Sequence, residues 1–148
     1  MKEILLVSGP NLDLLGVRSP EIYGSRTLEE HVTRARARAV DAGFTLRHLQ
    51  SNFEGDLIEA IHAARGVSAG IIINAGALTH SSWALADAVA IFPGPTIELH
   101  LSNPAAREPF RHVSTLAGVV SGSLAGLGAL GYLLAVDAVV ALLSESWT

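Results

Sequence analysis

The sequence contains no cysteine, which excludes disulfides and thiolate-bound metal ions. It is also poor in charge, since 16% of its residues are charged, against about 25% in average soluble domains. Lys2 is the only lysine, and the formal net charge of −4 offers no basic surface to a nucleic acid. The chain begins with Met1-Lys2-Glu3 directly before an apolar run, without a signal-peptide pattern. These features predict a cytoplasmic protein with no nucleic-acid partner.

Apolar residues, in contrast, are abundant: they make up 49% of the chain, and the mean hydropathy is +0.39. The length fits one domain, residues 1–148, and so much apolar surface predicts burial against further copies of the chain. The alternative is a membrane segment, because Leu116–Val136 carries no charge and is long enough to span a bilayer. This stretch is rich in glycine, however, and has no basic flank. We therefore predict a buried strand over Gly118–Ser121, a helix from about Leu124 to Leu143, and no membrane partner.

Continuous Val, Ile and Leu runs alternate with helix-periodic segments along the chain, which is typical of parallel strands covered on both faces. The polar segment Gly16–Ser25 between the first two elements is expected to be a mobile loop. The sequence predicts an α/β flavodoxin-like fold, a doubly wound five-stranded parallel sheet in the order 2-1-3-4-5 with helices on both faces. The remaining predicted strands are Lys2–Val7, Thr45–Leu49 near an edge, Ala69–Asn74 and Thr96–Leu101. The remaining predicted helices are Glu54–Arg65, Ser82–Phe92 and a helix that begins at a Thr27–Glu30 capping box and ends at Gly43.

Polar side chains follow three of these strands at their carboxyl ends, where doubly wound sheets bind ligands. Asn11 and Asn74 are expected to face each other across the point at which the strand order reverses. Glu98, His100 and Ser102 have the i, i+2, i+4 spacing that places three side chains on one face of a strand. A carboxylate beside an imidazole fixes its tautomer, which favours an acid–base site over a satisfied buried histidine. One histidine and one glutamate without cysteine are a thin ligand set, so no metal is predicted.

Other polar positions allow more than one interpretation. Tyr23 shares the polar loop with Arg18, and a cation could stabilise its phenolate as a base, although the spacing alone favours a solvated loop with a packed ring. Arg107 and Arg111 follow the fourth strand and could bind hydroxyls or a carboxylate, or simply pair with Glu108 at the surface. A GxGxxG pattern over residues 126–131 lacks a complete βαβ unit after it, so we assign these glycines to close helix packing.

Five ordered blocks of the sequence resemble type II 3-dehydroquinate dehydratase from Ile4 to about Leu143. That family has a flavodoxin-like fold, uses no cofactor and no metal, and assembles as a dodecamer of trimers. The resemblance implies removal of water from 3-dehydroquinate to give 3-dehydroshikimate, by anti elimination through an enolate, a step shared by aromatic biosynthesis and quinate breakdown. The blocks are Gly9-Pro-Asn-Leu-Asp-Leu-Leu-Gly16 with Pro20-Glu-Ile-Tyr-Gly24, Gln50-Ser-Asn52, Ile73-Asn-Ala-Gly76 with Thr79-His-Ser81, Glu98-Leu-His-Leu-Ser-Asn103, and Arg107-Glu-Pro-Phe-Arg-His112.

The resemblance also implies roles for the residues in these blocks. Tyr23 would remove the C2 proton, with Arg18 favouring its ionised form on a closing lid. Asn11 would hold a water that stabilises the enolate oxygen. His100, oriented by Glu98, would protonate the departing C1 hydroxyl. The substrate would be held by Asn74, by Ser102 and the backbone N–H groups of Leu101 and Ser102, by His80 and Arg111 at the ring hydroxyls, and by Asp87 of a neighbouring subunit.

The chain departs from the usual family pattern at Asp13, Ser19, Phe53, Ala86, Val113 and Thr115. None carries the expected chemistry, but a negative charge at Asp13 would weaken binding of an anionic substrate. An inactive or altered homologue that binds a quinate-like acid is the main alternative. A flavin-binding module would need a Ser/Thr-rich phosphate loop and more than the 5% aromatic residues present. A phospho-receiver domain would need an acidic cluster after the first strand and a lysine after the fifth.

Overall fold

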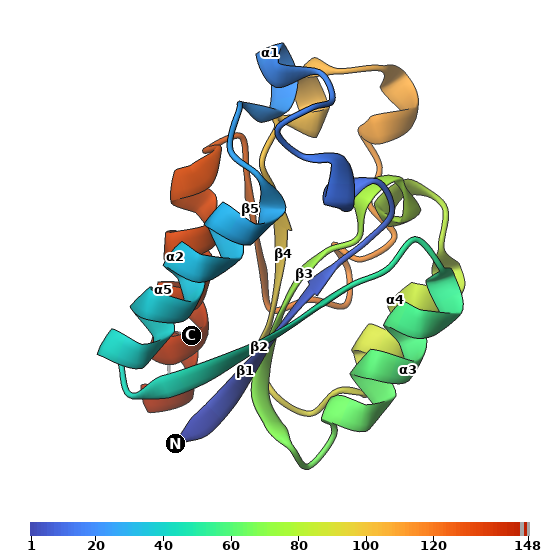
Figure 1. Cartoon of the computed structure of the whole chain (residues 1–148). Coiled ribbons are helices and arrows are strands. Elements are labelled where there is room, and N and C mark those ends of the chain that lie inside the picture. Colours follow the sequence, from blue (N-terminus) through green and yellow to red (C-terminus); the bar gives the residue numbers. More distant parts are fainter. Residues whose placement is uncertain (146, 148) are drawn as a thin grey trace.

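The computed structural model describes residues 1–145 and 147, which form a five-stranded sheet with every neighbouring pair parallel (Figure 1). The strand order β2-β1-β3-β4-β5 confirms the predicted topology and the predicted edge position of β2. The order reverses between β1 and β3, as a doubly wound sheet requires. The strands are β1 (Lys2–Ser8), β2 (Phe44–Gln50), β3 (Ser68–Asn74), β4 (Thr96–His100) and β5 (Gly122–Ala125).

Helices cover both faces of the sheet (Figure 1). The helices α2 (Leu28–Asp41) and α5 (Ala129–Ser144) pack on one face, while α3 (Glu54–Ala64) and α4 (Trp83–Ile91) pack on the other. The single-turn helix α1 (Pro20–Tyr23) and short 3-10 turns lie beyond the carboxyl ends of the strands. These turns are η1 (Leu12–Leu14), η2 (Gly76–His80), η3 (Pro104–Ala106) and η4 (Pro109–Arg111).

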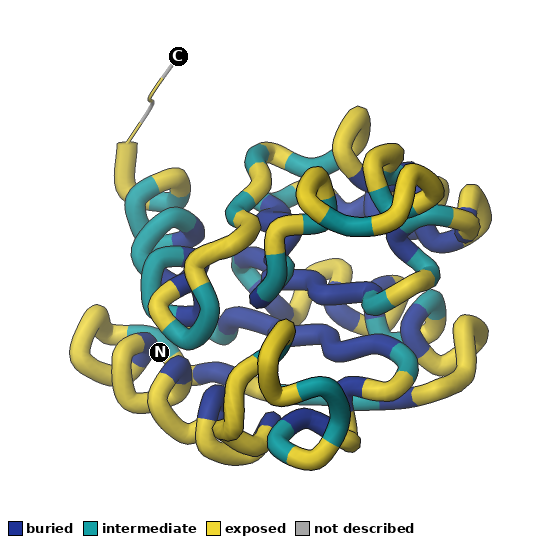
Figure 2. Tube along the Cα trace, turned by 90° about the horizontal axis from the view of Figure 1, so that it is seen from above, coloured by how far each residue is buried: buried dark blue, intermediate teal, exposed yellow. Residues whose placement is uncertain are grey.

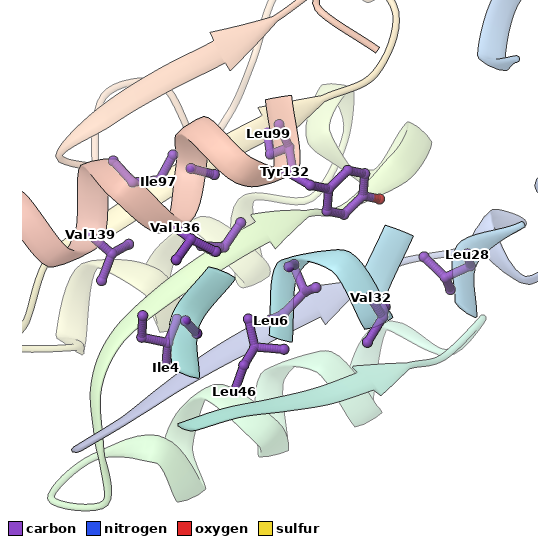
Figure 3. Close-up of a cluster of buried hydrophobic side chains, with 14 of the residues drawn as sticks. Ile4, Leu6, Leu28, Val32, Leu46, Ile97, Leu99, Tyr132, Val136 and Val139 are labelled. Carbon is purple, nitrogen blue, oxygen red and sulfur yellow. The ribbon is translucent and has the colours of Figure 1, made fainter. Parts of the chain in front are cut away.

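Alternating side chains of β1 enter two separate hydrophobic cores. Ile4 and Leu6 pack with α2 and α5, whereas Leu5 and Val7 face α3 and α4. Figure 3 shows the first core around Leu6 and Val136, and in Figure 2 the buried residues follow the strands between exposed helix surfaces. A strand buried on both faces needs a continuous apolar sequence, which explains why the sequence predicted β1 well.

The predicted capping box is present at the start of α2. Thr27 accepts a hydrogen bond from the Glu30 amide at 3.2 Å, and the Glu30 carboxylate accepts one from the Thr27 amide at 3.2 Å. Two of the unpaired amides at the helix start are thereby satisfied. Gly43, with φ of 86°, follows the helix end as expected.

The last strand and the last helix both begin later than predicted. Residues 118–121 form no strand, because the Val119 and Val120 amides turn back to the Leu116 carbonyl, and β5 covers residues 122–125 instead. The helix α5 begins at Ala129 and not near residue 124, since positive φ angles at two glycines interrupt the chain. Within the described residues, we find no helix with the length and apolar character needed to cross a membrane.

The structure also bears on two further predictions, for Gly131 and for the segment Gly16–Ser25. A Cβ added to Gly131 would lie 3.0 Å from Leu99 on β4, which confirms that this glycine allows close packing of α5 on the sheet. The segment Gly16–Ser25 is predicted to be a mobile polar loop, but it contains the single-turn helix α1. Pro20 presets the first helical turn there, and Ser19 before it has a left-handed φ of 38°.

Candidate active site

A cavity of about 110 Å³ lies beyond the carboxyl ends of β1, β3 and β4. Nine of the eleven site residues predicted from the sequence line it. Glu98 and Asp87 do not, and their positions are described below. The lining residues are Pro10, Asn11, Leu12, Arg18, Tyr23, Asn74, Gly76, Ala77, His80, His100, Leu101, Ser102, Pro104, Arg107 and Arg111.

Two tightly packed loops bring Asn11 and Asn74 to the same cavity. The Gly9 amide donates a 2.8 Å hydrogen bond to the Asn74 carbonyl. A Cβ at Gly9 would lie 2.5 Å from the Ala75 carbonyl oxygen, and one at Gly76 would lie 2.9 Å from the Pro10 carbonyl oxygen. Only glycine permits this approach of one backbone to the other.

The side chains of Gln50 and Asn52 hold the Asn11 turn in place. The Asn52 Oδ1 atom accepts hydrogen bonds from the Asn11 amide at 2.9 Å and from Gln50 Nε2 at 3.2 Å. Gln50 Nε2 also donates to the Gly9 carbonyl at 3.2 Å. These contacts hold Asn11 in a left-handed conformation with φ of 68°, which asparagine tolerates better than most residues.

Tyr23 lines the cavity, and the guanidinium groups of two arginines lie over its ring. Arg18 Nη2 donates to the Tyr23 hydroxyl at 3.3 Å, and its guanidinium carbon is 4.6 Å from the ring centroid. Arg107 lies 5.2 Å from the same centroid and donates to the Ser102 hydroxyl at 3.3 Å. The sequence left the role of Arg107 open, because its spacing gave no sign that it would reach the α1 segment.

Glu98 is buried directly behind His100 and binds it through a short hydrogen bond. His100 Nε2 is 2.6 Å from Glu98 Oε2, and the glutamate side chain is only 4% exposed. Because a carboxylate accepts but does not donate, the Nε2 atom carries the hydrogen, and the other ring nitrogen, Nδ1, remains for proton exchange. Ser114 also reaches this carboxylate, and nothing in the sequence indicated that contact.

His80 and Arg111 are oriented by neighbours outside the cavity. His80 Nδ1 lies 2.7 Å from the Val113 carbonyl oxygen, so Nδ1 carries the hydrogen. The His80 and His100 rings are stacked, with 6.4 Å between their centroids. Arg111 Nε donates to Glu108 at 2.6 Å. This hydrogen bond lowers the pKa of the exposed Glu108 carboxyl.

The charged and titratable side chains that line the cavity include several basic groups. Three arginines and two histidines line it, and the described residues that line it include no aspartate or glutamate. Asp13 lines a separate surface hollow with Arg36 and His48 and is not among the residues that line this cavity. Asp87 is exposed on α4, outside this cavity. The described residues contain no cluster of three or more side chains suited to hold a metal ion.

Fold and cavity together define an α/β enzyme of the acid–base type that acts on a small anion. The model of the family described as "Dehydroquinase class II" matches residues 2–140, and the chain belongs to that family. A 3-dehydroquinate dehydratase from Ruegeria pomeroyi is 54% identical over 144 residues, 97% of each chain. Crystal structures of type II dehydroquinases from Propionibacterium acnes and Butyrivibrio crossotus superpose with TM-scores of 0.92 and 0.90 at 38% and 39% identity. They cover 95% and 93% of this chain and 97% of each of theirs.

Proposed function

We propose that this chain removes water from 3-dehydroquinate to give 3-dehydroshikimate. The family membership supports this reaction, and one structural observation carries it. One cavity, whose lining residues include no aspartate or glutamate, contains two reactive groups. They are a tyrosine flanked by two guanidinium groups and a histidine paired with a buried carboxylate. An elimination needs one group to remove a proton and another to protonate the leaving hydroxyl, and the cavity offers both to an anionic substrate.

Tyr23 acts as the base in this proposal. A phenol is weakly acidic, so it serves as a base only where cations stabilise its phenolate. The Arg18 contact at 3.3 Å and the second guanidinium over the ring supply that stabilisation. The negative charge that develops on the substrate carbonyl oxygen is stabilised by a water held at Asn11, in the manner of an oxyanion hole.

His100 acts as the acid and protonates the departing C1 hydroxyl. Its Nε2–H bond to Glu98 stabilises the imidazolium form and leaves Nδ1 to donate the proton. The enolate intermediate separates the two proton transfers in time, so the two groups need not act together. The hydrogen bond to Glu98 also fixes the orientation of the His100 ring. A ring without a carboxylate partner would be less well positioned to donate its proton.

The turn after β4 holds the substrate carboxylate. The carbonyls of Leu101 and Ser102 accept hydrogen bonds from Gly128 at 3.1 Å and Gly126 at 2.8 Å, which fixes this turn. Its amides and the Ser102 hydroxyl, together with Asn74, bind the carboxylate and the neighbouring oxygens. His80 and Arg111 bind the ring hydroxyls.

The active unit is a homo-oligomer in this proposal, a dodecamer built of trimers, in the cytoplasm. Trp83 and Ile91 on α4 and Phe53 before α3 are 70%, 52% and 74% exposed, which is apolar surface suited to a subunit contact. Asp87 lies on the same helix and would reach the cavity of a neighbouring copy. Light scattering measures the assembly, and mixing inactive Tyr23→Phe and Asp87→Asn proteins tests the shared site. Activity must return in mixed oligomers if Asp87 acts across the interface.

The decisive experiment follows the ultraviolet absorbance of the conjugated enone product after purified protein is mixed with 3-dehydroquinate, in the presence of a chelator and without added cofactor. We expect turnover by the wild type and a loss of at least about a thousandfold in kcat for Tyr23→Phe, since the variant has no ionisable base. Binding of the substrate without turnover by the wild type would instead identify an inactive homologue that retains a quinate-like ligand.

A further inference from the structure

Ser114 contacts the same Glu98 carboxylate that binds His100. Its Oγ atom is 2.8 Å from Glu98 Oε1 and 3.0 Å from Oε2. In the described part of the chain, no lysine or arginine forms an ion pair with Glu98. The serine hydroxyl and the histidine ring are therefore the side-chain partners of a carboxylate that is almost fully buried.

The surroundings of Ser114 decide the direction of its hydrogen bond. The backbone amides of Leu116 and Ala117 both donate to Oγ, each at 3.1 Å. A hydroxyl oxygen has two acceptor lone pairs and one hydrogen, so these two amides occupy its acceptor capacity. The remaining hydrogen points to Glu98. Ser114 therefore donates to Glu98, and a hydrogen bond donated to a carboxylate favours its ionised form over the neutral carboxyl group.

Hydrogen bonds to residues in and just after η2 hold the segment around Ser114 in place. The Thr115 amide donates to the Thr79 carbonyl at 2.8 Å, and the Thr115 hydroxyl donates to the Ser82 carbonyl at 3.0 Å. The Val113 carbonyl accepts from His80. Three consecutive residues, Val113, Ser114 and Thr115, therefore connect the segment around η2 to the Glu98–His100 pair, and contacts other than the pair help to place the Ser114 hydroxyl.

We propose that Ser114 is a positioning residue for the acid step. It keeps Glu98 an ionised acceptor and thereby keeps the hydrogen of His100 on Nε2. If Glu98 took up a proton, its carboxyl group would donate to Nε2, and the ring would be left as a neutral Nδ1–H imidazole. A neutral imidazole is a far weaker acid than an imidazolium, so protonation of the leaving hydroxyl would slow. This inference rests on the proposed dehydration.

Ser114→Ala removes the donor to Glu98, and Ser114→Thr keeps a hydroxyl on the same carbon. The control is Ser121→Ala, because Ser121 Oγ accepts a 3.0 Å hydrogen bond from the Thr96 amide at the other end of β4. We expect kcat of Ser114→Ala to fall about ten- to a hundredfold, with KM within about threefold of the wild type, because Ser114 does not line the cavity. Ser114→Thr restores most of kcat, and the control keeps the wild-type value.

A second readout is independent of turnover. Nitrogen-15 NMR of the six histidines distinguishes the ring nitrogen that carries hydrogen from the one that does not, and a His100→Gln sample assigns the His100 signals. We expect the neutral wild-type ring to carry hydrogen on Nε2, and Ser114→Ala to shift the population toward Nδ1. Hydrogen on Nδ1 in the wild type, or the same ring signals and kcat in Ser114→Ala as in the wild type, would overturn the inference. Absent turnover in the wild type would contradict the dehydration alone, since the NMR result still decides the role of Ser114.

Discussion

The guanidinium group of Arg107 lies over the ring of Tyr23, with 5.2 Å between its central carbon and the ring centroid. The guanidinium carbon of Arg18 lies 4.6 Å from the same centroid, so the tyrosine on α1 is flanked by two cations from different parts of the chain. A cation near an aromatic ring is attracted to its electron-rich face, and the attraction to a phenolate is stronger still. Arg107 also binds Ser102, and it therefore connects the α1 segment to the turn after β4.

Removal of Arg107 is expected to impair the base more than the fold. We predict that Arg107→Ala lowers kcat/KM about ten- to a hundredfold, because the phenolate loses one of its two stabilising charges. Arg107→Lys keeps the charge but loses the planar group over the ring, and an intermediate value is expected. Steady-state kinetics with Arg65→Ala as a control decides this, since Arg65 is an exposed arginine after α3. Equal kcat/KM in the Arg107→Ala and control proteins would show that Arg107 has no role in the base.

The backbone contact beneath the site gives a prediction for stability. Gly9→Ala places a Cβ 2.5 Å from the Ala75 carbonyl oxygen, a backbone atom that cannot move alone. We expect a loss of about 1–3 kcal/mol in the free energy of unfolding, the range for overpacked positions, and a displaced Asn11 turn. Gly55→Ala in the first turn of α3 meets no atom within 4 Å and should be neutral or slightly stabilising. Urea unfolding of both variants measures the difference, and equal midpoints would contradict the tight contact.

The parts of the fold that local chemistry determines were predictable from the sequence. Ile4–Val7 and Ile71–Ile73 are continuous apolar runs, and Thr27 with Glu30 caps α2 through neighbouring atoms. Because parallel strands share one carboxyl edge, the strand order alone also predicted that Asn11 and Asn74 would meet at one cavity.

The misplaced strand β5 and the missed roles of Ser114 and Arg107 depend on contacts between residues that are distant in the sequence. The position of β5 depends on which residues reach β4, and the apolar stretch from residue 116 fits several registers equally well. Ser114 and Arg107 lie in a polar connection without periodicity, and their partners Glu98 and Tyr23 come from other elements. No local pattern distinguishes a serine that binds a buried carboxylate from one that faces solvent.

A well-formed surface ion pair is expected to matter little for stability. Arg38 and Asp137 join α2 to α5 through two hydrogen bonds of 2.7 and 2.8 Å, but their side chains are 49% and 40% exposed. Water screens such a pair, so we predict that the losses of stability caused by Arg38→Ala and Asp137→Ala are nearly additive in a double-mutant cycle. Thermal unfolding in low and high salt measures these losses. A double variant that is clearly less destabilised than the sum of the two single variants would mean that the two helices depend on this contact for their packing.

The pH dependence of stability should contain a contribution from His48 on β2. Burial, with a smaller contribution from the nearby Arg36, lowers the pKa of His48 to about 4 from the ordinary value of 6.5. Its ring nitrogen Nε2 lies 2.9 Å from the Ser8 hydroxyl. The unfolded chain therefore binds this proton at a higher pH than the folded chain does. The stabilisation is fully present above pH 6.5 and is lost as the pH falls from about 6.5 to about 4.

His48→Gln removes this titration and keeps a polar side chain that can bond to Ser8. We measure the free energy of unfolding of wild type and variant in urea at several pH values from 7.5 to about 4. The advantage of the wild type over the variant should shrink by about 1–2 kcal/mol across that window, a value reduced for the partial exposure of the ring. Burial also lowers the pKa of His31. His31 and the carboxylates are present in both proteins, so their contributions to the pH dependence cancel in the difference. His62→Gln on the exposed face of α3 serves as the control for the loss of a histidine outside the core. A difference between wild type and His48→Gln that does not change with pH would mean that the His48 ring accepts its proton in the folded protein as readily as in the unfolded chain.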